Sequence, residues 1–267
     1  MSTPRPSELP PQIGALECFR NAELRRIRKW LHPGARVLEI GAGSGFQARV
    51  LHGLGCAVTA IDVRVPQPSR RFWPVEPFDG LNLPFPESSF DLVFTSNVLE
   101  HVRDRPGLLR EIERVTSLRG YAIHIVPSAT WRLWTSVTRI LHVAWRGRKN
   151  DKSLEDAEPL PDQMLPPRSV LDVMLGRPHG EYASAALELW WFRRSKWSQA
   201  LRSSGFTQVA SFGNRLFYTG YTFLPQLPLE ARALASRVLG SSCHVFVLQR
   251  VDASPAGSPT VAERIGR

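Results

Sequence analysis

The pattern of apolar positions alternates between short runs and longer segments of helical period. The short runs are bounded by turn residues and indicate strands buried on both faces: Val37–Ile40, Ala57–Asp62, Phe90–Ser96 and Gly120–Val126. The longer segments repeat with a period near 3.6 and predict helices: Ala15–Leu31, Phe46–Leu54 and Arg105–Leu118. Strands that alternate with helices predict an open α/β sheet with mostly parallel strands.

The first predicted strand ends in three alternating glycines, Gly41, Gly43 and Gly45. Glycine is required where the backbone takes a positive φ or where a ligand approaches it closely. A dinucleotide site needs G-x-G-x-x-G, but Phe46 occupies the place of the third glycine. Glu39 at the strand end would also repel a diphosphate. A positively charged ligand without phosphate, such as S-adenosylmethionine, suits this turn better.

Four motifs follow one another in a fixed order along the chain. They are Glu39-Ile-Gly-Ala-Gly-Ser-Gly45, the acid Asp62 at the end of the second strand, Asp79-Gly-Leu-Asn-Leu-Pro-Phe85, and Leu99-Glu-His101. With them the chain resembles the class I S-adenosylmethionine-dependent methyltransferases, in particular the type 11-like domains, over residues 36–127. The resemblance implies a Rossmann-like, seven-stranded, mostly parallel sheet with an antiparallel last strand and helices on both faces.

The same resemblance implies which residues hold the cofactor. We expect them to be Glu39, Gly41, Ala42, Gly43, Gly45, Asp62, Val63, Asp79, Gly80, Leu81 and Asn97. Asp62 lies where such folds bind ribose hydroxyls. Asp79 matches the acid that accepts a hydrogen bond from the adenine amino group, although Asp79-Gly80 is also a typical turn.

The segment from Asn97 to His101 is implied to line the methyl-transfer face of the pocket. His101 is the candidate catalytic residue, as a general base whose pKa lies near neutrality. The alternative is that Glu100 and His101 fix the loop and cap the helix after Asp104. His179 and Glu181 form a second histidine–carboxylate pair, which could serve as a base or belong to a turn. We expect no metal, because the sequence shows no metal-ligand spacing.

The remaining core predicts a helix over 195–204 and an antiparallel hairpin of strands over 206–212 and 244–249. A third strand over 72–75 contains Pro74 and is expected near an edge. The methyltransferase domain is expected to span residues 15–251, between disordered segments 1–14 and 252–267. Within it, residues 128–194 form an insertion, where acceptor specificity would be built.

The insertion opens with a segment of helical period over 130–146. Its apolar arc comprises Leu133, Val137, Ile140, Leu141 and Ala144, with three tryptophans along one edge. Arginines at 132, 139 and 146 recur every seven residues on the opposite face. This pattern suits either peripheral membrane contact through residues 130–149 or an ordinary amphipathic helix packed as a lid over the active site. We favour the packed lid.

Composition narrows the class of protein. The chain has 267 residues, and 43% of them are hydrophobic, which is ordinary for a globular domain. Three cysteines far apart indicate neither disulfides nor a zinc site, so we expect a cytoplasmic protein. The net charge of +10 could indicate an anionic partner, but the basic residues are spread along the chain. Solvated helix faces explain them better, and a nucleic-acid partner is disfavoured.

These observations predict an S-adenosylmethionine-dependent methyltransferase. We expect a small-molecule, lipid-linked or glycan-linked acceptor, with oxygen favoured as the methylated atom. The alternatives are an RNA methyltransferase and a non-catalytic protein that keeps the fold to bind a partner. A nicotinamide oxidoreductase is disfavoured by Phe46 and Glu39.

Overall fold

The computed structural model describes residues 13–146, 176, 178–182, 184–202, 205–220 and 227–251. The expected disordered segments 1–14 and 252–267 lie almost wholly outside the described residues, as does most of the middle of the insertion. Within the described part of the chain, no helix is both long enough and apolar enough to cross a membrane.

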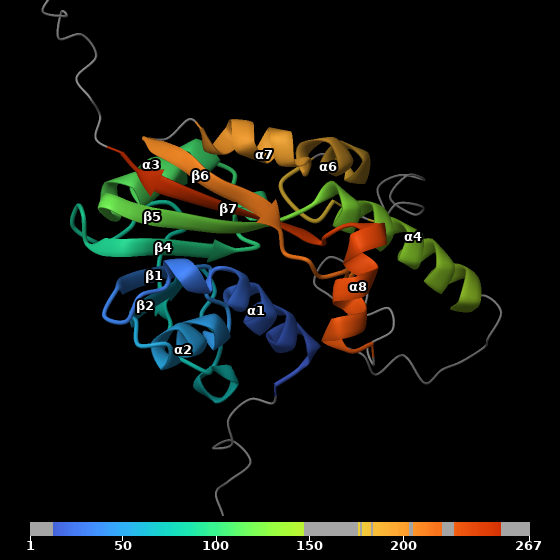
Figure 1. Ribbon diagram of the computed structural model, residues 1–267, viewed down its shortest axis with the longest axis horizontal. Coiled ribbons are helices and arrows are strands. Elements are labelled where there is room, and N and C mark those ends of the chain that lie inside the picture. The colour runs from blue at the N-terminus through green and yellow to red at the C-terminus, as the bar shows by residue number, and fades with distance from the viewer. Residues whose placement is uncertain are drawn as a thin grey trace, which may run out of the picture.

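A seven-stranded sheet forms the centre of the molecule, with strand order β3-β2-β1-β4-β5-β7-β6 (Figure 1). Its strands are β1 Arg36–Ile40, β2 Ala57–Asp62, β3 Glu76–Pro77, β4 Phe90–Ser96, β5 Thr116–Pro127, β6 Phe206–Gly213 and β7 Cys243–Arg250. The first five pair in parallel, whereas β7 runs antiparallel to both of its neighbours. The expected Rossmann-like sheet with an antiparallel last strand is therefore confirmed.

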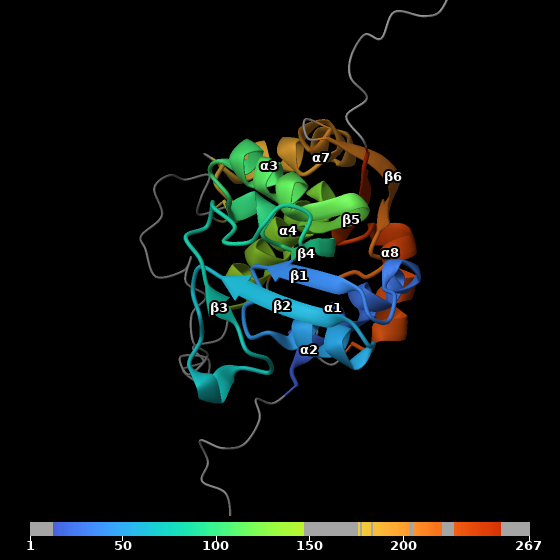
Figure 2. The ribbon, with the colours of Figure 1, turned by 90° about the vertical axis from the view of Figure 1, so that its left-hand side faces the viewer.

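Helices cover both faces of the sheet and one of its ends (Figures 1 and 2). They are α1 Ala15–Arg26, α2 Phe46–Gly53, α3 Arg105–Val115, α4 Ala129–Arg146, α6 Ala185–Trp191, α7 Arg194–Leu201 and α8 Leu229–Leu239. Short 3-10 turns are η2 Arg28–Trp30, η3 Pro68–Arg70 and η4 Leu99–His101. In Figure 1, α1 and α2 lie on one face of the sheet, α3 and α7 lie on the other, and α4 and α8 lie at the end where the parallel strands finish.

Two apolar clusters hold these layers together, one on each face of the sheet. On the first face Leu24 and Leu51 from α1 and α2 pack with Phe94 of β4. On the second face Ile112 of α3 and Trp197 of α7 pack against inward residues of the central strands. The strands are buried on both faces, which is why they appear in the sequence as continuous apolar runs.

The third strand differs from the expectation over 72–75. The observed β3 has only two residues, Glu76–Pro77, although it does lie at the sheet edge as expected. Residues 72–75 pack on the glycine turn instead, because the Phe72 N–H donates to Ser44 O at 2.8 Å and Trp73 lies against Gly45. Pro74, which has no N–H to donate, could not extend a strand here.

The last two strands are confirmed, but they do not form a simple hairpin. Helix α8, Leu229–Leu239, lies in their connection and was not predicted. Its buried residues include the polar Arg232 and Ser236, while Leu234 and Val238 are exposed at 63% and 86%. The apolar side chains of α8 do not form one face that packs on the core, so the usual amphipathic pattern could not predict this helix.

Helix α4 is also inverted relative to the expectation that its apolar arc packs inward. Leu133, Ile140 and Leu141 are exposed, whereas Arg132 and Thr135 are buried. The helix docks through its polar side, where the Arg132 Nε lies 3.3 Å from Glu188 Oε2 of α6. The expectation that this arc packs inward is therefore wrong, whereas the position of the helix as a lid over the active site stays a prediction.

His124 on β5 predicts a pH dependence of stability. Its ring is fully buried, with Nδ1 2.8 Å from Thr95 Oγ1, and burial lowers the pKa of His124 to about 3. The unfolded chain binds a proton at about pH 6.5, so the free energy of unfolding falls as the pH drops from there toward 3. When the pH falls from about 7.5 to about 5.5, the free energy of unfolding of His124→Leu should decrease by about 1 kcal/mol less than that of the wild type, as measured by urea unfolding. An equal loss in both proteins would refute this assignment.

Candidate functional site

The glycine turn after β1 is tied to the end of β2. The Gly43 N–H donates to Asp62 Oδ2 at 2.7 Å, and Asp62 Oδ1 accepts from the Arg64 N–H at 2.9 Å. The Gly41 and Ala42 N–H groups both donate to Ile61 O. The predicted cofactor residues of these two strand ends are therefore brought together. They lie beside the point where the strand order reverses from β1 to β4, which is where such sheets bind ligands.

Glu39 contributes a buried carboxylate to this turn. Its side chain is fully enclosed, and its Oε2 has no hydrogen-bond partner. Burial raises the pKa of Glu39 to about 8, because the charged form loses its hydration. A buried carboxylate oxygen without a partner is costly, and a cationic ligand would compensate it. This observation fits the ammonium group of S-adenosylmethionine.

Asn97 follows β4 with a left-handed backbone, at φ 55°. Its N–H donates to Ile125 O, which holds this conformation, and such conformations gather at functional sites. With the amide oxygen turned toward α1, Asn97 accepts hydrogen bonds from Arg20 Nη1 at 2.5 Å and Nη2 at 3.1 Å. Arg20 also donates to Glu23 at 2.9 Å. Sequence reasoning did not identify Arg20, because its partner Asn97 lies on a distant element.

The loop predicted to contact adenine lies beside the end of β2, where Val63 contacts Gly80. Asp79 Oδ1 accepts from the Leu81 and Asn82 N–H groups at 2.8 and 2.7 Å, and Oδ2 accepts from Asn82 Nδ2. These hydrogen bonds lower the pKa of Asp79, and the bond from the Asn82 side chain has the largest effect. Asp79 thus forms the turn that the sequence offered as the alternative. Its contact with adenine stays a prediction.

Three side chains meet beyond the end of β4. His101 Nε2 lies 3.9 Å and His179 Nε2 lies 4.0 Å from the same oxygen, Glu100 Oε1. The two rings are in contact, with centroids 4.7 Å apart. Burial raises the pKa of Glu100 to about 8, lowers that of His179 to about 3 and lowers that of His101. The sequence showed no such cluster, because His179 lies far from the other two along the chain.

His101 does not cap the helix that follows it. That role belongs to Asp104, whose Oδ1 accepts from the Gly107 N–H at 2.9 Å. Glu181 does not pair with His179 either, because it forms a surface ion pair with Arg103 at 2.9 Å. The role of His101 as a general base stays a prediction. Its ring is about half exposed, so a ligand can reach it.

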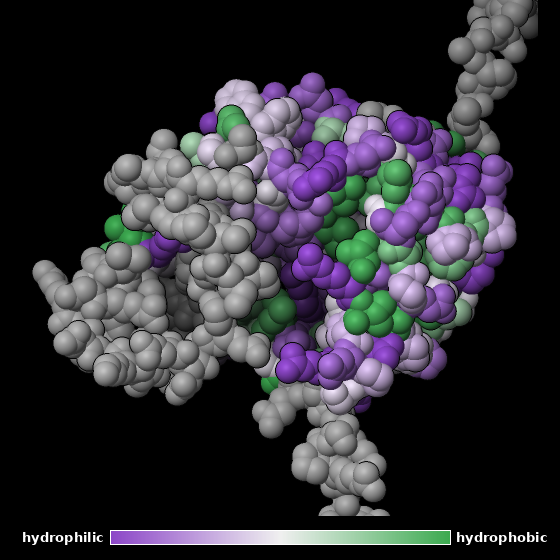
Figure 3. Space-filling model, turned by 180° about the vertical axis from the view of Figure 1, so that it is seen from behind, coloured by the Kyte–Doolittle hydropathy of each residue, from purple (hydrophilic) through white to green (hydrophobic). Residues whose placement is uncertain are grey.

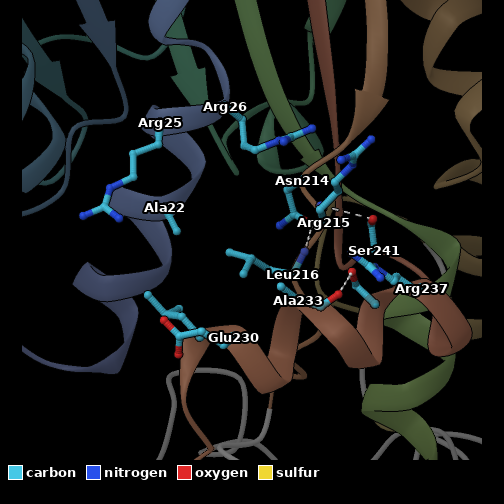
Figure 4. Close-up of a pocket in the computed structure, with 12 residues that line it drawn as sticks. Ala22, Arg25, Arg26, Asn214, Arg215, Leu216, Glu230, Ala233, Arg237 and Ser241 are labelled. Carbon is cyan, nitrogen blue, oxygen red and sulfur yellow. Dashed lines mark hydrogen bonds between the residues drawn. The ribbon is translucent and has the colours of Figure 1, made fainter.

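A separate groove of about 780 Å³ lies between α1, α8 and the segment after β6 (Figure 4). Arg25, Arg26, Arg215 and Arg237 line it, with Glu230 at one end. It contains none of the predicted cofactor residues. On the opposite side of the molecule from that shown in Figure 1, apolar residues border a hollow near the centre of the described surface (Figure 3).

Comparisons with known proteins agree with this geometry. Residues 15–211 match the model of a family described as a methyltransferase domain. The chain is 38% identical over 111 residues to a demethylmenaquinone methyltransferase from Corynebacterium urealyticum, covering 40% of this chain and 47% of that protein. It is 36% identical over 100 residues to a malonyl-[acyl-carrier protein] O-methyltransferase from Halorhodospira halophila, covering 34% of each. A glycine/sarcosine/dimethylglycine N-methyltransferase from Actinopolyspora halophila is 29% identical over 112 residues, covering 38% of this chain and 20% of that protein.

The chain spans less than half of the length of each of these relatives. Solved structures support the fold over a larger part of the chain. An S-adenosylmethionine-dependent methyltransferase from Mesorhizobium loti superposes with a TM-score of 0.52 at 19% identity, covering 86% of this chain and 98% of that one. A methyltransferase of the same kind from Methanosarcina mazei gives a TM-score of 0.51 at 17% identity, covering 85% and 97%.

The glycine turn generates a prediction that separates ligand contact from folding. A Cβ added at Gly43 would meet nothing within 4 Å, whereas one at Gly45 would lie 2.8 Å from Trp73 Cβ. Gly43→Ala should cost about 1 kcal/mol of folding free energy, from its positive φ, and weaken S-adenosylmethionine binding at least about tenfold. Gly45→Ala should cost about 2–3 kcal/mol, because Trp73 must move. Calorimetric titration and thermal unfolding measure both effects, and wild-type affinity in Gly43→Ala would remove this turn from the binding site.

Proposed function

The chain belongs to the methyltransferase-domain family, and from this premise we propose that it transfers a methyl group from S-adenosylmethionine to an oxygen acceptor. The acceptor is a small molecule or is attached to a lipid or glycan. The observation that carries the proposal is the unpartnered, buried carboxylate of Glu39 beside an open glycine turn. A cationic amino-acid cofactor satisfies both features at once.

The residues of the strand ends divide the work of holding the cofactor. Glu39 receives the ammonium group, and the open backbone at Gly43 allows close approach. Asp62 already accepts one hydrogen bond at each oxygen, so each oxygen keeps a lone pair for a ribose hydroxyl. Arg20 holds the amide of Asn97, which follows β4. We call the region around Glu39 and Asp62 the cofactor side and the region around Glu100, His101 and His179 the acceptor side.

When bound, S-adenosylmethionine supplies an electrophilic methyl group on a sulfonium. In the transfer the carbon–oxygen bond forms as the carbon–sulfur bond breaks, and the acceptor proton is released. The protein mainly holds the acceptor in line, and orientation of this kind can supply roughly 7–11 kcal/mol. Oxygen is favoured because the half-exposed imidazole of His101 can accept the proton of a hydroxyl acceptor, whereas a neutral amine needs no base before it attacks the methyl group.

The surface around the acceptor side suits an apolar acceptor. Leu133 and Leu141 of α4, and Trp190 of α6, are each about half exposed. Arg193 and Lys196 lie over the ring of Trp190, which is a combination suited to a lipid headgroup region. Among the relatives, a malonyl-carrier enzyme is named an O-methyltransferase and others are named N-methyltransferases, so the names alone leave the methylated atom open.

Glu39→Gln tests the cofactor site with an isosteric change. Loss of the charge should weaken S-adenosylmethionine binding about 10–100-fold, because charge-assisted hydrogen bonds contribute roughly 1.5–3 kcal/mol. Thermal stability should stay about the same, because a carboxyl with a pKa of about 8 is mostly neutral near pH 7 in the free protein, as the amide is. The matched control is Asp91→Asn at the start of β4, away from the glycine turn, where Asp91 pairs with Arg36 at 2.7 Å. Equal affinity in wild type and Glu39→Gln would contradict the assignment.

The activity itself is tested by two measurements on the full chain. Calorimetry should show binding of S-adenosylmethionine and none of NADH. Release of S-adenosylhomocysteine is then followed with long-chain fatty acids, phenols and the matching amines. We expect turnover with oxygen acceptors and little with amines. Absence of S-adenosylmethionine binding would overturn the enzyme assignment, and turnover with amines alone would overturn the choice of oxygen.

A further inference from the structure

The cluster of Glu100, His101 and His179 has the composition of a metal site. One ligand atom from each residue lies within 4.8 Å of the other two. Two imidazoles and one carboxylate are the donor set of many catalytic zinc centres, whereas magnesium and calcium prefer sites made of oxygen alone. The cluster lies at the end of β4, beside Asn97 on the acceptor side.

Glu100 supplies an independent sign that a ligand is needed there. Its side chain is fully buried, and neither Oε1 nor Oε2 has a hydrogen-bond partner. The two imidazole nitrogens approach Oε1 only to 3.9 and 4.0 Å, which is too long for hydrogen bonds. Three donor groups thus face one another without bonding. A buried carboxylate in this state costs free energy that a cation would offset.

The spacing fits a cation after a small contraction. Ligand atoms about 2.0–2.1 Å from a tetrahedral ion lie about 3.4 Å from one another. The two separations from Glu100 Oε1, 3.9 and 4.0 Å, exceed this by about half an ångström, and the separation between the histidine nitrogens, which is within 4.8 Å, exceeds it by at most about 1.4 Å. Rotation of the exposed histidine side chains can supply this contraction. His101 and His179 keep 45% and 36% of their side chains exposed, so a fourth position opens toward solvent.

The loop that carries His179 is built onto the cluster. The Glu181 N–H donates to Glu100 O at 2.9 Å. Glu188 Oε1 accepts from the N–H groups of His179 and Gly180, and the ring of Trp131 contacts that of His179. A Cβ at Gly180 would lie 2.4 Å from Glu100 O, so only glycine allows this approach. These contacts fix His179 opposite Glu100.

We propose that Glu100, His101 and His179 bind one divalent transition-metal ion of the zinc class. The ion leaves its fourth position free for the acceptor. This role rests on the proposed function and deepens it, because a coordinated hydroxyl or carboxylate oxygen would be held beside Asn97. Coordination lowers the pKa of a bound hydroxyl, which releases its proton to solvent without a protein base. The substrate class is then an acceptor with a metal-binding oxygen.

Cobalt binding tests the site without any measurement of activity. The full chain is treated with a chelator, dialysed and titrated with Co²⁺, and the visible absorption of the bound ion reports its ligands. We expect one ion per chain and displacement by Zn²⁺. His179→Asn and Glu100→Gln should each weaken binding at least about 100-fold and abolish the absorption band. The matched control, His52→Asn, changes an exposed histidine on α2 and should bind Co²⁺ as the wild type does.

A second variant keeps all three ligands and moves only the loop. Gly180→Ala should weaken Co²⁺ binding about 10–100-fold, as changes in supporting residues do. Wild-type Co²⁺ affinity in His179→Asn, or binding without a fixed stoichiometry, would overturn the proposal.

Titration with S-adenosylmethionine separates this inference from the proposed function. His179→Asn should bind the cofactor with wild-type affinity, because His179 does not contact the glycine turn. If the wild type binds Co²⁺ but not S-adenosylmethionine, the metal site stands and methyl transfer falls. If it binds S-adenosylmethionine but not Co²⁺, the metal site falls and methyl transfer stands.

Discussion

Two carboxylates are buried at the end of the sheet where the parallel strands finish, and their burial is the constraint on what this end of the sheet can bind. Glu39 lies near the end of β1 and Glu100 follows the neighbouring strand β4, and each is almost fully removed from water with at least one oxygen unpaired. Burial raises the pKa of each to about 8. A cation bound beside either carboxylate would offset the free energy that its burial costs.

Around that end the helices follow a different packing rule from those on the faces of the sheet. On the faces, α1, α2, α3 and α7 bury apolar residues against strands. At the end of the sheet α4 and α8 turn polar residues inward, where Arg132 pairs with Glu188 of α6 and Arg232 donates to the backbone carbonyl of Leu227. Leu133 and Val238 are left exposed as a result. The apolar surface around the site thus follows from what lies beneath these helices.

Local patterns identified those parts of the fold that depend on neighbours in sequence. The β4 strand was expected and observed over the same residues, and the α2 helix begins at Phe46 as predicted. The apolar run of β4 and the glycine turn before α2 are each encoded within about ten consecutive residues, so a local pattern is enough to predict them. The failures occur where long-range contacts decide. Residues 72–75 fold onto the Gly45 turn instead of joining the sheet, and α8 carries its apolar residues outward.

The sequence by itself determined the sheet, the glycine turn and the position of Asp62, because spacing along one strand–turn–helix unit is a local property. It also placed Glu39 and Asn97 at strand ends, which parallel pairing brings to a common edge. Only the tertiary structure decided that Arg20 reaches Asn97 and that His179 faces Glu100. Those contacts join segments about 80 residues apart. The first depends on the packing of α1 beside the end of β4, and the second forms because the Glu181 N–H donates to Glu100 O and docks one loop on the other.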